Sequence, residues 1–299
     1  MIFNGSSHII NPLARERRFG FGSGVGGAAS FLGAMDAYTA NLVGLYSVGY
    51  RLLASYTGSL IRVRRSSDST EQDIGYLANG KIDVASLNTF IGGGSWFLRK
   101  IYDQSGNARD MPQATAAQQP QGGVDGNSIA YCFAASGAGD NTIRMALTGL
   151  SIAATGGKTS TMSVASGTGY ASGLMMARKS DWTQARQIWA LGTLVFTDNQ
   201  PGAGTNSSLG SLTSGNVYSM VHQTGASENR ITRGTSTAAT GTAAASALII
   251  GELGIGYLSG GPQWKELSKF YAGAVWSDDV GNSTADAISD ALKALFVTS

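Results

Sequence analysis

The fold is decided by residues 46–114, which contain Tyr46-Ser-Val-Gly-Tyr-Arg-Leu, Ser55-Tyr-Thr-Gly-Ser, Ile61-Arg-Val-Arg-Arg-Ser-Ser-Asp, Gln72-Asp-Ile-Gly and Tyr102-Asp-Gln-Ser-Gly-Asn-Ala-Arg-Asp. Within this stretch, residues 60–64 alternate apolar and basic side chains, as a half-buried strand does. Residues 82–91 have a helical spacing that places Val84, Leu87 and Ile91 on one face. Residues 96–102 read as another strand. The stretch therefore mixes strands with one short helix.

The segment Tyr102-Asp-Gln-Ser-Gly predicts a tight turn with a structural role. The side chains of Asp103 and Ser105 can hydrogen-bond nearby backbone amides, and Gly106 can adopt a positive φ. We therefore expect these residues to hold a turn, with contact to a ligand as the alternative.

The order and spacing of these segments resemble the start of the catalytic domain of glycoside hydrolase family 54, the α-L-arabinofuranosidase B family. They resemble still more its non-enzymatic relatives in phage virion proteins and bacterial surface proteins. The resemblance is specific over residues 46–114, diffuse over 215–299 and absent before about residue 40. It implies a concanavalin A-like β-sandwich.

The part of the chain after residue 121 predicts a series of short strands separated by turns, which is typical of a sandwich. The expected strands are 128–134, 159–165, 173–177, 188–196, 217–222, 247–251 and 267–276. A terminal helix should follow, with Ser283 and Asp286 as a capping box. Its apolar stripe should comprise Ala287, Ile288, Ala291, Leu292 and Leu295.

Residues 1–40 are predicted to form an extended N-terminal arm that precedes a sandwich spanning 41–299. The segment Phe19-Gly-Phe-Gly-Ser-Gly-Val-Gly-Gly is too rich in glycine for a regular helix. We expect the arm to contact partner subunits or other virion proteins in a homo-oligomer of closed symmetry. The resemblance to phage fibres described above implies a trimer as one such assembly.

Composition narrows the functional classes. The chain of 299 residues has 42 glycines, about twice the usual share of about 7%. Only 13% of its residues are charged and the net charge is +2, so no nucleic-acid footprint is visible. No apolar run is long enough for a membrane helix. The start of the chain lacks the pattern of a signal peptide, which favours synthesis in the host cytoplasm and a location in a virion.

The chemistry-bearing residues are few. Cys132 lies in an apolar run and is expected to be buried. His222 is expected to be half-buried in a sheet, and His8 lies far from it in the chain. One cysteine and two histidines cannot form a usual zinc site, and no nucleotide motif has the required strand–turn–helix context. No metal and no cofactor is therefore predicted, although a calcium ion held by aspartates and backbone carbonyls stays open.

The resemblance also implies a catalytic test, because enzymes of that family need two carboxyl groups. Their nucleophile lies in a Gly-Asn-Ala-Glu-Thr-like segment, and none of the five glutamates has such a context: Glu16, Glu71, Glu228, Glu252 and Glu266. Residues 175–189 offer Asp181 and no glutamate, and the cysteines characteristic of the family are missing. A new pair such as Asp181 with Glu228 would be a coincidence. The expectation is that the chain is not an enzyme.

A ligand site is predicted in residues 176–186. Aromatic rings stack on sugars while charged side chains hydrogen-bond their hydroxyls. The predicted ligand-binding residues are Arg178, Asp181, Trp182 and Arg186. The alternative is an ordinary loop whose Trp182 packs on the sandwich.

These observations favour a phage virion appendage, such as a tail fibre, tail tip or head fibre, that binds host-surface glycan. Two alternatives stay open: an arabinofuranosidase-like hydrolase or depolymerase, and a bacterial surface protein that binds carbohydrate.

Overall fold

The structure is a computed structural model that describes residues 31–134, 143–166, 172–180, 185–191, 194–200, 208–209, 217–224, 228–233, 238–242, 248–258, 261–262 and 269–296. The chain divides into two compact units, residues 1–30 and 31–299. The second unit begins at Phe31, ahead of the predicted boundary at residue 41. Met35 explains the difference, because its side chain is fully buried in the core of this unit and its backbone N–H donates to Leu52 O. The role of the segment before Phe31 stays a prediction.

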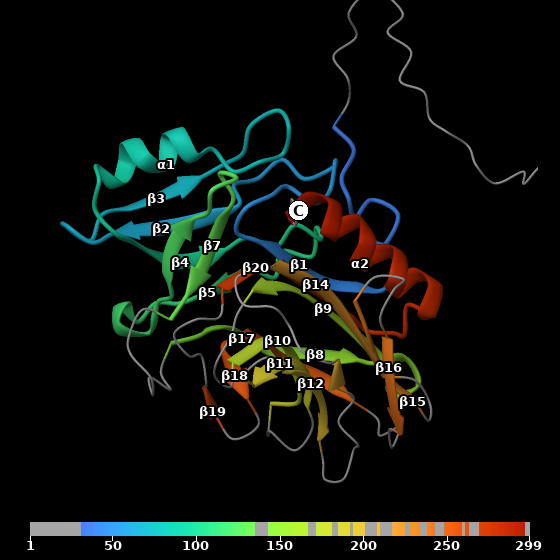
Figure 1. The fold of residues 1–299 in the computed structure, drawn as a ribbon. Helices are drawn as coiled ribbons and strands as arrows, with labels where there is room; N and C mark the ends of the chain where they lie inside the picture. Colours follow the sequence, from blue (N-terminus) through green and yellow to red (C-terminus); the bar gives the residue numbers. More distant parts are fainter. Residues whose placement is uncertain are drawn as a thin grey trace, which may run out of the picture. The chain divides into compact units, whose positions relative to one another are not determined.

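The larger unit is a sandwich of two antiparallel sheets, as predicted (Figure 1). In the described part of the chain the first sheet has twelve strands, ten of them in the order β16-β15-β14-β9-β20-β7-β6-β4-β2-β3, with β1 paired to β20 and β5 paired to β4. Their bounds are β1 Leu42–Ser47, β2 Ile61–Arg65, β3 Glu71–Ile74, β4 Trp96–Ile101, β5 Met111–Pro112, β6 Gln121–Val124, β7 Ala130–Phe133, β9 Thr159–Ser166, β14 Val217–Thr224, β15 Glu228–Thr232, β16 Ala238–Thr242 and β20 Lys269–Trp276.

The second sheet has the order β13-β12-β11-β10-β17-β8 in the described ranges. Its bounds are β8 Met145–Ala153, β10 Ser172–Arg178, β11 Ala185–Leu191, β12 Leu194–Gln200, β13 Ser208–Leu209 and β17 Ile249–Ile255. The short strands β18 Tyr257–Leu258 and β19 Gly261–Pro262 pair with each other.

Two α-helices accompany the sheets: α1 Val84–Ile91 and α2 Asn282–Phe296. The side chain of Asp83 caps α1 by accepting from Ser86 N at 3.0 Å, and Gly92 ends the helix in the left-handed conformation. Two short 3₁₀ turns, η1 Ala116–Gln118 and η2 Thr155–Gly157, complete the described elements.

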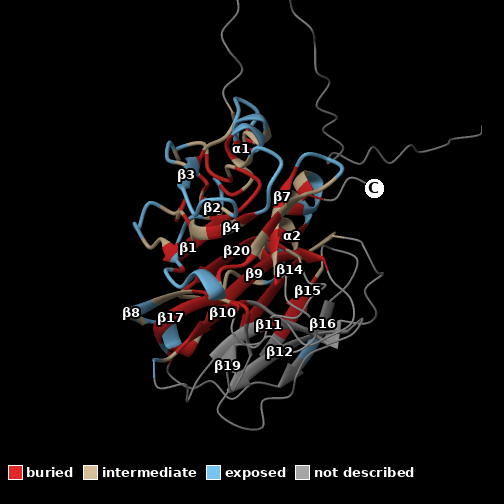
Figure 2. Cartoon of the chain, turned by 90° about the vertical axis from the view of Figure 1, so that its left-hand side faces the viewer, coloured by how far each residue is buried: buried red, intermediate tan, exposed pale blue. Residues whose placement is uncertain are grey.

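The core has two parts. One lies between the two sheets and under α1, and includes Leu98, Met175 and Leu253. The other lies on the opposite face of the first sheet, where α2 covers it, and includes Met162 and Trp276 (Figures 1 and 2). The first sheet is thus buried on both faces along its central strands, which is why all eight residues of β9 are buried.

Helix α2 differs in detail from its prediction. It buries Ala285, Ile288, Ser289, Leu292 and Phe296, so Ile288 and Leu292 of the predicted stripe face the sheet. Asp286 does not form the predicted capping box with Ser283. Its carboxylate instead accepts hydrogen bonds from Arg230 and Thr232 of β15, because α2 docks on the end of this strand.

Most predicted strands exist, with two changes. Residues 188–196 were predicted as one strand but form parts of two, β11 and β12, which pair as a hairpin. The strand predicted at 247–251 is β17, and it continues to Ile255. Cys132 is fully buried, as predicted, and burial raises the pKa of its thiol. Within the described residues, no helix is both long and apolar enough to span a membrane.

Candidate functional site

The turn at Asp103 is a hydrogen-bond clamp, as predicted. Its side chain is 5% exposed. One oxygen, Oδ1, accepts from Leu45 N at 3.0 Å and from Ser105 N at 2.9 Å. The other, Oδ2, accepts from Ser105 Oγ at 2.7 Å and from Arg109 N at 3.0 Å. Gly106 has the expected positive φ, at 86°. The carboxylate therefore fastens the turn to β1 and has no lone pair directed at a ligand.

The next residue, Gln104, fastens a second segment of the same region. Its Oε1 accepts from Leu52 N at 2.7 Å, and its Nε2 donates to Tyr50 O at 2.9 Å. It is buried, and both ends of its amide are satisfied by backbone groups that lie outside the strands. Two further side chains fasten β1 in the same way, with Asn107 donating to Leu42 O and Arg109 donating to Val43 O.

On the exposed side of this region, Arg62 on β2 and Asp73 on β3 form an ion pair with two hydrogen bonds, at 2.7 and 2.8 Å. The Tyr102 hydroxyl also donates to Asp73 Oδ1, at 2.7 Å. The Arg62 guanidinium holds the pKa of the Asp73 carboxyl below its usual value. Partial burial and the bond to Asp73 raise the pKa of Tyr102 to about 12. This cluster joins neighbouring strands and, like Asp103, has its groups occupied within the scaffold.

The predicted ligand-binding residues fall into two groups. Asp181 and Trp182 lie outside the described residues, and only the backbone of Arg186 is described, in β11 opposite Ala177. Arg178 lies at the end of β10 and is 3% exposed. The prediction that these four residues bind a ligand stays open, but Arg178 is a buried side chain and not the surface residue that the sequence suggested.

Arg178 forms a buried ion pair with Glu252 of β17. The distance from Arg178 Nη2 to Glu252 Oε2 is 2.5 Å, and the two residues are directly opposite in the β10–β17 register. Glu252 is 4% exposed, and its other oxygen, Oε1, is buried without a hydrogen-bond donor. A buried carboxylate with an unused oxygen is rare, because leaving such a group unsatisfied costs about 1–3 kcal/mol.

The pair lies on the outer face of the second sheet. Met175, Ala177, Leu253 and Ile255 belong to the core between the sheets. Because side chains alternate along a strand, Arg178 and Glu252 point to the other face. We take the two side chains, together with the strand ends that hold them, as the candidate functional site.

Sequence reasoning missed Glu252 as a site residue. A signal was present, since Leu248-Ile-Ile-Gly-Glu places a carboxylate in the middle of an apolar strand. A charged residue in such a run is rarely fully buried unless it is paired. What could not be read from the sequence was its partner, which lies 74 residues away in the chain.

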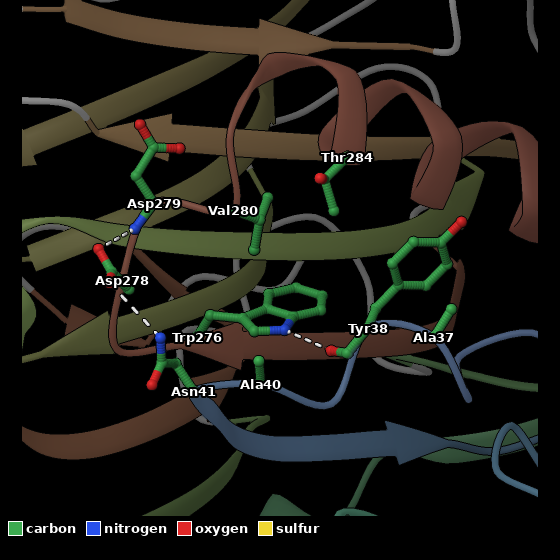
Figure 3. A pocket seen from close by; sticks show the side chains of 9 residues that line it. All are labelled: Ala37, Tyr38, Ala40, Asn41, Trp276, Asp278, Asp279, Val280 and Thr284. Carbon is green, nitrogen blue, oxygen red and sulfur yellow. Dashed lines mark hydrogen bonds between the residues drawn. The ribbon is translucent and has the colours of Figure 1, made fainter.

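A second candidate is a hollow of about 280 Å³ beside the start of α2 (Figure 3). Its lining includes Tyr38, Asn41, Trp276, Asp278 and Asp279. Aromatic, amide and carboxylate groups are the set that sugar binding uses, so the hollow has to be weighed against the ion pair.

Most polar groups of the hollow already have hydrogen-bond partners in the scaffold. Trp276 is fully buried and its Nε1 donates to Tyr38 O at 2.8 Å. Asp279 Oδ1 accepts from Gln223 Nε2 at 2.7 Å and from Gly281 N at 2.9 Å. Figure 3 shows the Asp279 carboxylate pointing away from that of Asp278. The two carboxylates thus do not converge on one point, and the hollow is the weaker candidate.

Among the residues that the structure describes, no three His, Cys, Asp or Glu side chains are grouped so as to hold a metal ion. His222 is 1% exposed, so it is more deeply buried than the half-buried position predicted for it.

Comparison with known proteins confirms the resemblance. The family model of the catalytic domain of α-L-arabinofuranosidase B matches residues 36–177. A probable α-L-arabinofuranosidase B of Aspergillus flavus is 32% identical over 124 residues, which are 40% of this chain and 24% of that protein. An α-L-arabinofuranosidase of Hypocrea jecorina is 31% identical over 117 residues, which are 38% and 22% of the two chains. The chain therefore spans about a quarter of the length of these relatives.

Solved structures confirm the fold. A mutant of a family 54 α-L-arabinofuranosidase soaked with 4-nitrophenyl α-L-arabinofuranoside superposes with a TM-score of 0.68 at 17% identity. The superposition covers 89% of this chain and 66% of that one. An arabinofuranosidase complexed with arabinofuranosyl-α-1,2-xylobiose gives a TM-score of 0.65 over 90% of this chain and 66% of that one, also at 17% identity.

These findings correct two predictions. The expected phage virion appendage is wrong, because the matching family and the relatives named above are arabinofuranosidases. The expectation that the chain is not an enzyme is contradicted by the same findings. It rested on the lack of a glutamate in the expected sequence context and on the missing cysteines, and a missing context does not exclude a carboxylate from another strand.

Proposed function

We propose that this chain carries the sandwich domain of a glycoside hydrolase that acts on α-L-arabinofuranosides. The observation that carries the proposal is the match of the arabinofuranosidase B catalytic domain to residues 36–177. The matched segment ends at Ala177, the residue before Arg178. It therefore contains β10 up to the residue before Arg178, and the proposed site residues Arg178 and Glu252 lie after it.

The described carboxylates of the matched segment are held by the scaffold. Each acidic side chain that the structure describes within residues 36–177 accepts a hydrogen bond from the scaffold: Asp36, Asp68, Glu71, Asp73, Asp83, Asp103, Asp110 and Asp125. None of these side chains has a buried oxygen without a hydrogen-bond donor, which distinguishes them from Glu252.

Glu252 combines an orienting ion pair with an oxygen that has no hydrogen-bond donor, but this oxygen is buried and a substrate must displace what covers it. In a retaining glycosidase, one carboxylate attacks the anomeric carbon and a second carboxyl group protonates the leaving group. Arg178 fixes Glu252 Oε2 as an ion pair, and Oε1 has no hydrogen-bond donor. We assign Oε1 as the attacking oxygen and Arg178 as the group that orients it.

The second carboxyl group is assigned by sequence position alone. Asp181 is the first acidic residue after Arg178 in the chain. It is proposed as the acid that protonates the leaving group.

The test is hydrolysis of 4-nitrophenyl α-L-arabinofuranoside by the full chain. Glu252→Gln should lower kcat/KM by at least about a hundredfold, since covalent and acid–base assistance each contribute at that scale. Asp181→Asn should lower kcat/KM for this substrate by a smaller factor. Nitrophenolate is a good leaving group and needs little protonation.

Asp278→Asn is the matched control, because Asp278 is a carboxylate in the competing hollow. It should keep wild-type activity. An inactive wild-type chain, or a Glu252→Gln variant that is as active as wild type, would overturn the proposal. Loss of activity in Asp278→Asn alone would move the site to the hollow.

A further inference from the structure

We infer that Gly251 is a positioning residue that keeps Arg178 opposite Glu252. The inference concerns a backbone feature next to the ion pair. Its catalytic consequence rests on the proposed function, whereas its effect on the ion pair does not.

Gly251 lies opposite the irregular part of β8. Ile250 pairs with Ile152 and Glu252 pairs with Thr148, so Gly251 is the single residue of β17 that faces residues 149–151 of β8. The extra residues of this β-bulge therefore belong to β8. A bulge bends and twists the local strand pairing, and such features are frequent beside active sites. Gly251 and Glu252 thus lie directly at the irregular part of the sheet.

Ser180, which follows β10 in the chain, lies close against Gly251. A Cβ atom built on Gly251 would lie 2.7 Å from Ser180 N, 3.0 Å from Ser180 Cβ and 3.2 Å from Ser180 Cα. The first distance is shorter than real Cβ contacts, and the atom it meets is backbone, which cannot rotate away. Only glycine allows so close an approach of two backbones here.

Ser180 is linked to Arg178 through one residue, Lys179. The pair Arg178–Glu252 is also the last register pair that joins β10 to β17. A methyl group on residue 251 would push Ser180 outward at the point where strand pairing ends. The displacement would therefore pass to Arg178 and lengthen its contact with Glu252.

The experiment is a double-mutant cycle carried out in two backgrounds. Unfolding of the full chain is measured for Arg178→Met, Glu252→Gln and the double variant, first with Gly251 and then with Gly251→Ala. With Gly251, the coupling between the two side chains should change the unfolding constant by about tenfold or more. In the Gly251→Ala background, it should fall to within about twofold of no coupling.

A merely steric role would lower stability and leave this coupling intact, so unchanged coupling in the Gly251→Ala background overturns the inference. Gly75→Ala is the matched control, because a Cβ atom at Gly75 meets no atom within 4 Å. It should leave the coupling at its wild-type size.

A second variant covers the case in which Gly251→Ala does not fold. Ser180→Gly removes the Cβ atom that the new methyl group meets and frees the Ser180 backbone. The combination of Gly251→Ala with Ser180→Gly should fold and regain part of the coupling. If it too fails to fold, Gly251 is required for the fold itself and the positioning role is overturned.

Kinetics separate this inference from the proposed function. Gly251→Ala should lower kcat about tenfold or more with KM within about twofold of wild type, as expected for a displaced catalytic group. A wild-type chain without activity, combined with the expected loss of coupling, would overturn the function and keep the role of Gly251. An active wild type with unchanged coupling in the Gly251→Ala variant would support the function and overturn the role of Gly251.

Discussion

The motif block of residues 46–114 and the β10–β17 region use polar side chains in opposite ways. In the motif block, buried polar groups such as Asp103 and Gln104 make hydrogen bonds to the backbone of neighbouring segments. In the β10–β17 region, Arg178 and Glu252 bind each other, and one oxygen of Glu252 stays without a donor. In the first region the side chains of Asp103 and Gln104 have all their buried polar atoms hydrogen-bonded, whereas in the second Glu252 Oε1 has no donor.

The difference shows that the sequence segments shared with the family indicate the fold and not the chemistry. The residues that carry the family resemblance, above all Tyr102-Asp-Gln-Ser-Gly, hold the scaffold together. Their presence therefore indicates the fold strongly. The candidate chemistry lies in strands whose sequences have no recognisable motif, and their side chains meet only in the folded protein.

The largest expected effect is that of Asp103→Ala on stability. The change removes an acceptor of four hydrogen bonds and leaves the buried Leu45 N–H without a partner. Because bonds to a charged group contribute about 1.5–3 kcal/mol each, we expect a loss of about 4 kcal/mol or more. Urea unfolding followed by fluorescence measures it. A loss below about 1 kcal/mol would show that the clamp is not what holds β1, and the contrast between the two regions would weaken.

Arg178→Met comes next. It leaves the Glu252 charge buried without its cation, which typically costs about 3–5 kcal/mol. The double variant Arg178→Met with Glu252→Gln should recover part of this loss, because no uncompensated charge then remains. Thermal melting of the single and double variants measures the loss of stability and its recovery. If the double variant is as unstable as Arg178→Met alone, the pair acts through packing and not through charge.

Asp83→Ala should have a smaller effect within the motif block. Asp83 caps α1 by accepting from Ser86 N and Ser86 Oγ, but it lies at an exposed position. Losing an N-cap costs about 1 kcal/mol. Comparison with Asp103→Ala by the same urea titration separates a surface cap from the buried clamp. Equal losses of stability in the two variants would contradict the claim that the buried Asp103 clamp contributes more than a helix cap.

The smallest expected effect is a pH dependence from Tyr102. Its pKa is raised to about 12 in the folded chain by burial and by the bond to Asp73, whereas an unfolded tyrosine titrates near about 10. The raised pKa means that folding favours the neutral phenol. The resulting stability is fully present below about pH 10 and is lost as the pH rises towards about 12.

The variant Tyr102→Phe tests the direction of this change of stability with pH. The phenylalanine variant should melt slightly below wild type at about pH 8, and the two melting temperatures should converge between about pH 10 and about pH 12. Calorimetry of both proteins at several pH values measures the difference. A constant difference across the whole range would show that the hydroxyl bond to Asp73 does not contribute.

The sequence by itself determined the β-sandwich, helix α1, the turn at Asp103 and the burial of Cys132. Each of these rests on local information: the alternation or spacing of apolar residues, and a short turn whose donors and acceptors lie a few residues apart. Local patterns also showed which faces of the strands are apolar. They could not show the hairpin of β11 and β12, or that Met35 belongs to the core.

Only the tertiary structure decided the candidate site. Arg178 and Glu252 meet because β10 pairs with β17 in one register, and a shift by one residue would turn either side chain to the other face. That register depends on non-local strand pairing and on the β8 bulge opposite Gly251, which no local pattern specifies. The same reason explains why Glu252 was passed over in the sequence: a lone glutamate in an apolar strand acquires its role only from the strand that packs beside it.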